Sequence, residues 1–306
     1  MGSRGLRLDG IHHVTSITGD AQANVDFYAG RLGLRLVKKT VNQDDPTVYH
    51  LFFGDDKGSP GLDLTFFEYP GARAGRPGHG MIHRIVLRVA SDAALDFWHY
   101  RVGGERNNGS LLFSDPEGLG LEMRHVDTSD EPLTASNAEI PSEFAIQGFE
   151  EVRAYTADPQ RSRSLFEDAM AFERDGGMSW VARGEARGGR YVFDPAPPDP
   201  GIPGAGTVHH VAWASLDDEQ PIWRDRLIKA GASPTPVIDR YWFKSVYFRE
   251  PSGVLFEIAT MGPGFAVDEH PEHLGERLIL PPRFEHLRDR LDVTLTPIHA
   301  PASARA

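Results

Sequence analysis

Short runs of β-branched residues interrupted by a pair of polar residues recur along the chain. Ile11–Thr15 reads Ile-His-His-Val-Thr, and Val208–Ala212 reads Val-His-His-Val-Ala. Ile82–Val86 and Phe149–Arg153 are weaker copies, in which arginine or glutamate stands at the position of the second histidine. The runs follow one another at intervals of about 60 to 70 residues, and self-similarity at a fixed period indicates repeated structural units. The chain is therefore predicted to consist of four similar units.

Each run precedes a segment with helical spacing, which is followed by further β-rich runs. In the first unit, Asp20 can cap a helix that ends at Gly33, with Val25 and Tyr28 on its apolar face. The other helices are expected to begin after these residues: Ser91, Asp158-Pro159, and Asp217 or Asp218. The β-rich runs include Val48–Phe53, Leu62–Phe67, Leu111–Phe113, Leu119–Met123, Trp242–Phe248 and Val254–Ala259. Each unit is thus predicted to have the order β-α-β-β-β.

A polar stretch rich in Ser, Asp, Asn and Pro separates the second unit from the third, at residues 128–141. Such a composition is typical of a connection between structured regions. We therefore predict an N-terminal domain of residues 1–135, a C-terminal domain of residues 136–262 and a tail of residues 263–306, in a fold of the α+β class. The tail is expected to contain two elements: a short helix, Arg283–Leu291, and an unstructured end, Pro301–Ala306.

The composition excludes several classes of protein. The chain has 306 residues and no cysteine, which excludes disulfide scaffolds, thiolate-bound zinc, iron–sulfur clusters and a cysteine nucleophile. With 32 Lys and Arg against 44 Asp and Glu, its net charge of −12 disfavours binding to nucleic acid or to an anionic membrane. No apolar segment approaches the roughly 20 residues of a membrane span, and the first ten residues lack the apolar core of an export signal. We expect a cytoplasmic protein.

The closing hairpin of the fourth unit indicates which side chains share a sheet face. A turn centred on Pro251 places Val246 opposite Phe256 and makes one face apolar, as packing against helices requires. Because strand side chains alternate, Tyr247 and Glu257 are expected on the other face, as diagonal neighbours.

The histidine pairs supply candidate metal ligands. Alternation places His210 opposite the core-facing residues of its strand, so it shares a sheet face with Glu257. In the first unit the alternation is less decisive, and His13 is preferred to His12 by analogy with His210. Two histidines and one carboxylate form a facial triad, which leaves three adjacent positions open on a divalent metal such as iron(II). The residues alone leave a second interpretation open, in which the histidines are half-buried strand residues and Glu257 is a solvated carboxylate.

Several segments resemble a known family. They are Gly10–Thr15, Tyr49–Asp55 with Gly58–Gly61, Val208–Ala212, Pro251–Glu257 and the tail segment Leu278–Pro282. The chain resembles the vicinal oxygen chelate (glyoxalase/bleomycin resistance/dioxygenase) superfamily, and within it the ring-cleaving hydroquinone dioxygenase branch. The resemblance implies two domains of cupped sheets and iron(II) held by His13, His210 and Glu257. It also implies that the first and fourth units build the site together, because the third unit offers Glu151 where catechol-cleaving relatives need a histidine.

The same resemblance implies roles for residues around the metal. Tyr247 is similar to the family's active-site tyrosine, whose hydroxyl can hydrogen-bond a substrate oxygen or stabilise an intermediate. Arg240 resembles a pocket arginine that can pair with a phenolate or with the carboxylate of an opened ring. His12 and His209 match pocket histidines that can act as general acids or bases, although alternation points both away from the ligands. Thr15 is a weaker candidate for substrate contact. A purely structural role is the alternative for each.

These observations predict a non-haem iron(II)-dependent, extradiol-type dioxygenase that cleaves the ring of a hydroquinone; manganese(II) suits the same ligands. Its partners are then a small aromatic substrate and O2, and both a monomer and a homo-oligomer agree with the sequence. Two alternatives stay open: a glyoxalase-like metal-dependent isomerase or lyase, and a non-catalytic protein that binds an aromatic or quinone.

A second segment, Asp268–His273, also combines histidines with carboxylates. Pro271 breaks any helix through it, so its side chains are not held at helical spacing. We interpret the segment as a solvated loop rather than a metal site.

Overall fold

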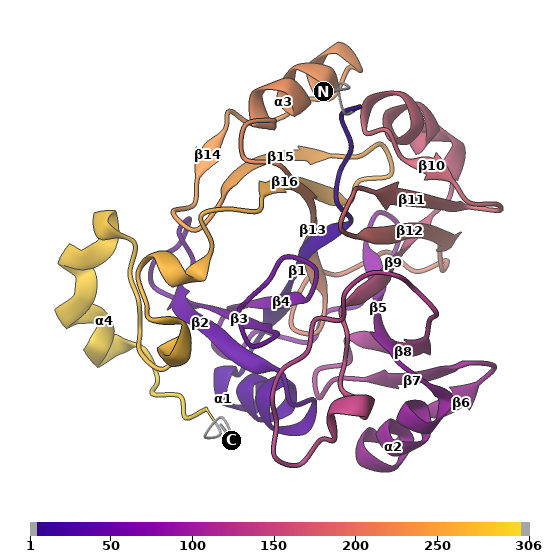
Figure 1. Cartoon of the computed structure of the whole chain (residues 1–306). Helices are drawn as coiled ribbons and strands as arrows, with labels where there is room; N and C mark the ends of the chain where they lie inside the picture. Colours follow the sequence, from indigo (N-terminus) through magenta and orange to yellow (C-terminus); the bar gives the residue numbers. More distant parts are fainter. Residues whose placement is uncertain (1–4, 301–306) are drawn as a thin grey trace.

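The computed structural model describes residues 5–300, which contain two eight-stranded sheets (Figure 1). In the first sheet the strand order is β14-β15-β16-β13-β1-β4-β3-β2. Its strands are β1 (Ile11–Thr18), β2 (Arg35–Val41), β3 (Tyr49–Gly54), β4 (Asp63–Glu68), β13 (Val208–Ser215), β14 (Ile238–Asp239), β15 (Lys244–Arg249) and β16 (Leu255–Thr260). Antiparallel pairing of β1 with β13 joins the first unit to the fourth.

The second sheet joins the two middle units in the same way, through antiparallel pairing of β5 with β9. Its strand order is β10-β11-β12-β9-β5-β8-β7-β6. Its strands are β5 (Ile82–Val89), β6 (Glu105–Asn107), β7 (Ser110–Ser114), β8 (Gly120–His125), β9 (Phe149–Thr156), β10 (Glu173–Arg174), β11 (Ser179–Arg183) and β12 (Gly188–Pro195). Each sheet draws strands from both sides of residue 135, and the domain boundaries at residues 135 and 262 stay a prediction.

The predicted order β-α-β-β-β is confirmed in the first, second and fourth units, whereas the third unit has 3-10 and π-helical turns in place of the α-helix. The fold is of the α+β class. The helical segments of the units are α1 (Ala21–Val25) with a π-helical turn (Asp26–Arg31), α2 (Asp92–Val102), two turns in the third unit (Pro159–Ser162 and Leu165–Ala169), and α3 (Gln220–Lys229). Asp20, Ser91 and Asp158 each cap the following helical segment, as predicted. The expected cap at Asp217 or Asp218 is wrong, because α3 follows Glu219, whose side chain makes no capping bond.

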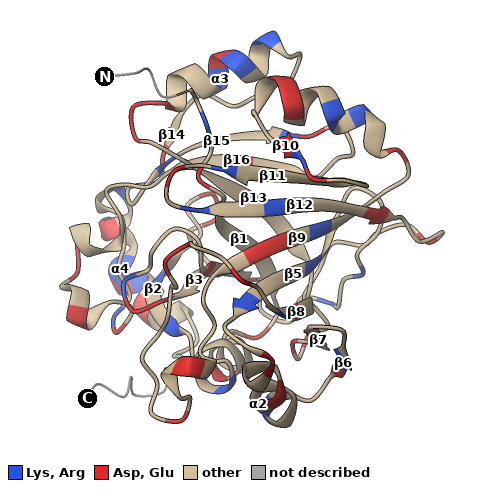
Figure 2. Cartoon of the chain, turned by 45° about the vertical axis from the view of Figure 1, so that its right-hand side comes forward, with Lys and Arg blue, Asp and Glu red and all other residues tan. Residues whose placement is uncertain are grey.

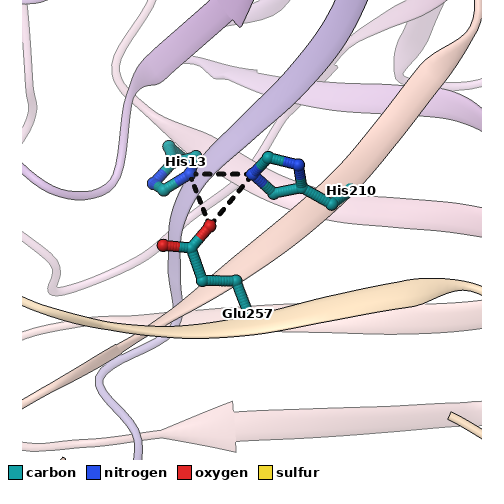
Figure 3. A group of neighbouring side chains, drawn as sticks. All are labelled: His13, His210 and Glu257. Carbon is teal, nitrogen blue, oxygen red and sulfur yellow. Dashed lines mark hydrogen bonds and ion pairs between the residues drawn. The ribbon is translucent and has the colours of Figure 1, made fainter. Parts of the chain in front are cut away.

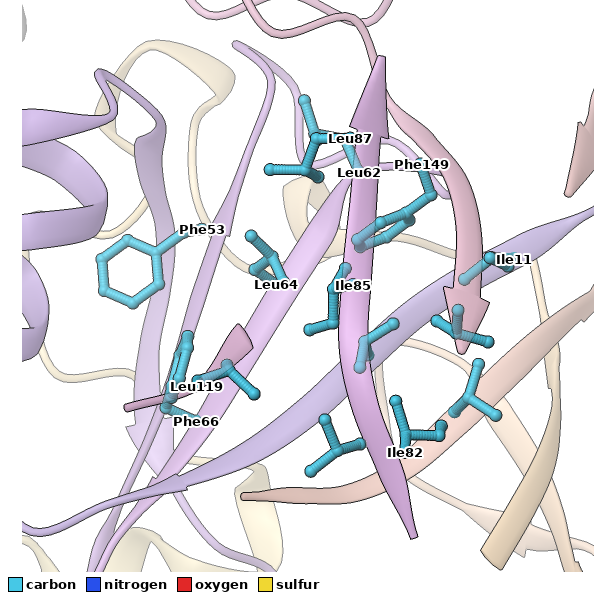
Figure 4. Packing of buried hydrophobic residues seen from close by; sticks show 14 of the residues in the cluster. Ile11, Phe53, Leu62, Leu64, Phe66, Ile82, Ile85, Leu87, Leu119 and Phe149 are labelled. Carbon is cyan, nitrogen blue, oxygen red and sulfur yellow. The ribbon is translucent and has the colours of Figure 1, made fainter. Parts of the chain in front are cut away.

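The apolar faces of the two sheets meet in one continuous core. Ile11 and Leu64 of the first sheet belong to the same buried cluster as Ile82 and Ile85 of the second (Figure 4). Full burial of side chains of this size contributes about 1.5–3 kcal/mol each. Alternation then directs the intervening residues of the first sheet to its opposite face, where Phe52 belongs to a separate buried cluster.

The closing hairpin differs from the expected register by two residues. Val246 pairs with Ile258 rather than with Phe256, because the turn is centred one residue later than Pro251. A shift of two residues in pairing leaves every side chain on its predicted face, since strands alternate with a period of two. Tyr247 therefore lies directly opposite Glu257 instead of diagonally from it.

The tail returns from the fourth unit to the first. Ile279 N donates to Lys39 O at 2.9 Å, so the tail runs beside β2 at the edge of the first sheet. Its helical segments are Phe265–Val267, Pro271–His273, Pro282–Leu287 and α4 (Arg288–Thr294), and one further turn, Ser142–Phe144, lies between the second and third units. The last two tail segments replace the single helix expected at Arg283–Leu291. The unstructured end expected at Pro301–Ala306 lies outside the described residues. No helix within residues 5–300 has the length and apolar character needed to cross a membrane.

Candidate metal centre

His13, His210 and Glu257 meet on one face of the first sheet (Figure 3). His13 Nε2 lies 3.2 Å from both His210 Nε2 and Glu257 Oε2, and His210 Nε2 lies 3.0 Å from the same carboxylate oxygen. All three side chains are buried. Among the described residues, this is the one group of His, Asp and Glu side chains found close enough together to hold a metal ion.

Strand pairing explains why three residues so distant in sequence converge. Ala212 on β13 pairs with His13 on one side and with Glu257 on the other. His210 stands two residues before Ala212, and residues two apart on a strand share a face. The facing arrangement predicted for these residues is thus the one that the first sheet adopts.

The donor atoms fit a divalent metal. Adjacent ligands of an octahedral metal, bound at about 2.1 Å, lie about 3.0 Å apart, close to the three separations observed here. Glu257 Oε1 accepts a hydrogen bond from Ser245 Oγ at 2.5 Å, whereas buried Oε2 receives none. Burial alone raises the pKa of Glu257, but the positive charge that His13 and His210 carry when protonated outweighs burial and holds this pKa well below its usual value. The carboxylate is therefore ionised and has one oxygen free for a cation.

His12 fixes the orientation and tautomer of His13. His12 Nε2 lies 3.1 Å from Thr260 O, and a carbonyl only accepts, so this nitrogen carries the proton of the neutral ring. His12 Nδ1 is then an acceptor, and His13 Nδ1, 2.9 Å away, donates to it. In a neutral His13 this leaves the Nε2 lone pair facing Glu257. His209 makes the equivalent contact with His210, with 2.8 Å between the Nδ1 atoms.

A β-bulge brings His12 into this contact. The pairing of β1 with β13 is irregular between Ile11 and His13, so His12 is the extra residue. The simple alternation expected for His12 therefore breaks at this point. Neither His12 nor His209 lines the cavity in front of the ligands, but each contacts the far nitrogen of its neighbour.

These histidines predict a loss of stability in acid. Burial and the neighbouring His13 lower the pKa of His12 from 6.5 to about 3. Below pH 6.5 the unfolded chain therefore binds a proton at His12 that the folded chain does not bind. The free energy of unfolding consequently decreases as the pH is lowered below 6.5, whereas above pH 6.5 this group has no effect. We expect His12 to account for a loss of about 2 kcal/mol between pH 7 and pH 5, measured by urea unfolding in a chelator. A His12→Asn variant should lose less over that range, and an equal loss would contradict the assignment.

Most of the residues predicted to bind substrate line the cavity in front of the candidate ligands. Its lining includes Arg240 and Tyr247, and Arg240 Nε donates to Tyr247 Oη at 3.2 Å. Burial, reinforced by Glu257, raises the pKa of Tyr247, so its phenol stays protonated. Thr15 is outside the lining set, but its Oγ1 lies 3.0 Å from His210 Nε2.

Sequence reasoning missed several lining residues. His50 lies in the wall, with its Nε2 3.0 Å from Thr65 Oγ1. A signal for His50 was available, since Leu51 and Phe53 face the core and alternation sends His50 and Phe52 to the other side. The other missed lining residues lie in loops or on strands without a distinctive motif; they are Asn42, Gln43, Asp44, Phe52, Phe67, Trp242 and Phe243.

Comparison with known proteins identifies the family. The profile of the Glyoxalase/Bleomycin resistance protein/Dioxygenase superfamily matches residues 10–123 and 148–258. The chain belongs to this superfamily. MhqO of Bacillus subtilis, named as a ring-cleaving dioxygenase, is 41% identical over 94% of this chain and 96% of its own length. The chlorohydroquinone/hydroquinone 1,2-dioxygenase of Sphingobium indicum is 32% identical over 93% of this chain and 95% of its own.

Solved structures agree with this assignment. A crystal structure from Bacillus subtilis, titled as a dioxygenase, has a TM-score of 0.88 and 39% identity, and covers 97% of this chain and 99% of its own. Glyoxalase I from Zea mays has a TM-score of 0.55 at 14% identity, with 88% of this chain and 97% of its own covered. The second similarity concerns the superfamily fold alone.

In this member of the superfamily, the second sheet carries ion pairs where the first carries the candidate metal ligands. Val86 pairs with Glu122 and Glu151, as Ala212 pairs with Glu257 and His13. Arg124 donates to both carboxylates, at 2.7 Å to Glu122 and 3.0 Å to Glu151. Arg84, at the position matching His210, also donates to Glu122. Acidic and basic positions accordingly lie close together on β9 and its neighbours (Figure 2). A fixed guanidinium thus provides positive charge between these carboxylates.

The segment Asp268–His273 is only partly the solvated loop that was expected. His270 and His273 are exposed, and neither belongs to the metal-binding group. Asp268 and Glu269, in contrast, form ion pairs with the buried ammonium group of Lys38. No sequence pattern indicates this contact, because Lys38 lies more than 200 residues from both carboxylates.

Proposed function

We propose that the chain is a non-haem iron(II)-dependent dioxygenase that cleaves a hydroquinone-type aromatic ring beside a hydroxyl-bearing carbon. The observation that carries the proposal is the buried triad of His13, His210 and Glu257, which opens on a cavity lined by aromatic and cationic side chains. The name of the Sphingobium relative, which covers nearly the whole chain, supports hydroquinone as the substrate class.

For the metal we propose His13 Nε2, His210 Nε2 and Glu257 Oε2 as ligands. Iron(II) held by these residues would supply the electron transfer that allows dioxygen to react with a carbon of the aromatic ring. Manganese(II) suits the same ligands, and metal analysis of the natively purified protein distinguishes the two. The contacts of His12 and His209 support a positioning role, in which each holds a ligand ring with its Nε2 toward the metal.

For substrate we propose that Tyr247, Arg240 and Thr15 bind and orient the ring. The protonated phenol of Tyr247 can donate to a substrate oxygen, and the guanidinium of Arg240 stabilises negative charge on that oxygen. The 3.2 Å hydrogen bond between the two side chains supports their acting on one group. Thr15 Oγ1, close to both His210 and Thr65, can accept or pass a proton.

An oxygen-uptake assay tests the proposed reaction. Protein loaded with iron(II) under argon is expected to consume one O2 per hydroquinone after mixing with aerated buffer, without an added reductant. We expect at least tenfold faster uptake with hydroquinone than with catechol. Absence of uptake with every dihydroxybenzene would contradict the proposal. Conversion of a thiol adduct without oxygen consumption would favour the isomerase or lyase alternative instead.

A further inference from the structure

The cavity in front of the metal ligands is too small for an aromatic ring as it stands. Its volume is about 30 Å³. A cavity of about 150 Å³ accommodates benzene in a protein core. A ring can therefore reach the ligands only if part of the cavity wall moves.

Asp44 is the most exposed part of the cavity wall. Among the described residues that line the cavity, it alone is exposed, with 72% of its side chain accessible. Its carboxylate accepts two hydrogen bonds from Arg240, at 2.8 and 2.9 Å. The side chain of Arg240 is itself only 13% exposed. The ion pair thus forms the outer side of the cavity, and breaking it exposes the guanidinium toward the interior.

The Asp44–Arg240 pair also joins the two edges of the first sheet. Asp44 lies in the loop after β2, Arg240 lies in the turn after β14, and these strands are the opposite edges in the strand order. Gln43 reinforces the junction, because its Nε2 donates to Arg240 O at 2.7 Å. The guanidinium of Arg283 in the tail in turn donates to Gln43 Oε1 at 2.6 Å.

The backbone beside Arg240 is strained. Tyr241 has a φ of +74°, in the left-handed region that residues other than glycine rarely adopt. Its N–H donates to Asp239 Oδ1 at 2.7 Å, which helps to hold this conformation. Strain of this kind persists only where surrounding contacts over-determine it. The contacts of Gln43 and Asp44 are among those that hold the turn.

We infer that Asp44 is a latch that a substrate must displace from Arg240, and that this exchange selects aromatic rings with two oxygens para to each other. This inference rests on the proposed function. When one oxygen of a para-diol lies at the metal site, its second oxygen lies at the far end of the ring. That second oxygen can replace the Asp44 carboxylate on the guanidinium of Arg240. An ortho-diol has both oxygens at the same end and leaves Arg240 paired with Asp44. The latch therefore favours hydroquinones over catechols.

Hydrogen–deuterium exchange tests the latch without any substrate. In Asp44→Asn, the amides of residues 43–48 and of residues 240–243 should both exchange at least threefold faster than in the parent protein. The matched control is Asp45→Asn, because the Asp45 side chain accepts its hydrogen bonds from Thr47 of the same loop, and Asp45 does not line the cavity. Its effect should stop at residues 45–48. Unchanged exchange at residues 240–243 in Asp44→Asn would overturn the inference.

Steady-state kinetics of the iron(II)-loaded protein tests the selection. We expect Asp44→Asn to lower KM for hydroquinone at least threefold with kcat within twofold, and to reduce the preference for hydroquinone over catechol at least threefold. Asp45→Asn should leave both unchanged. An unchanged or higher KM, or an unchanged preference, in Asp44→Asn would overturn the inference. If the parent protein turns over neither diol, the proposed function fails, and the exchange experiment alone decides on the latch.

Discussion

Replacing Glu257 by glutamine is expected to abolish both metal retention and oxygen uptake. The substitution keeps the shape of the side chain but removes the buried negative charge between His13 and His210. An amide nitrogen turned toward the metal would also present donors instead of a lone pair. Loss of an outer partner of a metal ligand already costs 10–100-fold, so loss of a ligand should lower metal affinity and turnover by more than about 100-fold. Metal content after dialysis and the oxygen electrode measure the two effects.

Glu122→Gln is the matched control, because Glu122 occupies the position in the second sheet that corresponds to Glu257. This variant breaks ion pairs with Arg84 and Arg124, so it should unfold at a lower temperature. Its iron content and turnover per folded molecule should match those of the parent protein. If Glu257→Gln retains iron as well as Glu122→Gln does, the triad is not the metal site.

Replacing Lys38 by methionine is expected to produce the largest loss of stability. The Lys38 ammonium group is fully buried and bonds to Asp268 at 2.7 Å, to Glu269 and to Phe265 O at 3.2 Å. Its removal leaves the two carboxylates uncompensated, and breaking a buried ion pair in this way costs about 3–5 kcal/mol. The melting temperature should fall by about 5–15 °C in a differential scanning experiment. Trp242, which lines the cavity, donates a hydrogen bond from its Nε1 to Asp268, so the cavity wall is expected to loosen too.

Lys39→Met serves as the comparison for Lys38→Met. The ammonium group of Lys39 donates to the carbonyl of Glu276 in an exposed contact, so its loss should cost less than about 1 kcal/mol. Equal melting temperatures for the two variants would show that the buried ion pairs do not hold the tail in place.

The first and fourth units could be predicted in detail because their signals are local. Histidine pairs at matching positions and a hairpin with one apolar face place His210 and Glu257 on the same side of the sheet. The predicted sheet faces are correct although the predicted register is not. Val246 pairs with a residue two positions beyond the expected one, and a shift of two leaves each side chain on the same face of the sheet. The prediction of His13 depends on its analogy with His210, and the common pairing partner Ala212 explains why the analogy holds.

The remaining features depend on contacts that strand alternation does not encode. His12 and Val37 stand at bulges, where alternation fails, and the second bulge precedes buried Lys38. The partners of Lys38 and Asp44 lie in the tail and in the fourth unit, about 200 residues away. No sequence motif marks either ion pair, because each depends on how the tail and the edge strands close over the site.

Anomalous X-ray diffraction at the iron absorption edge, from crystals grown with iron(II), tests the metal assignment most directly. We predict one anomalous peak about 2.0–2.2 Å from His13 Nε2, His210 Nε2 and a carboxylate oxygen of Glu257. A peak elsewhere, such as at Asp268–His273, or crystals that contain iron with no peak between these three side chains, would contradict it.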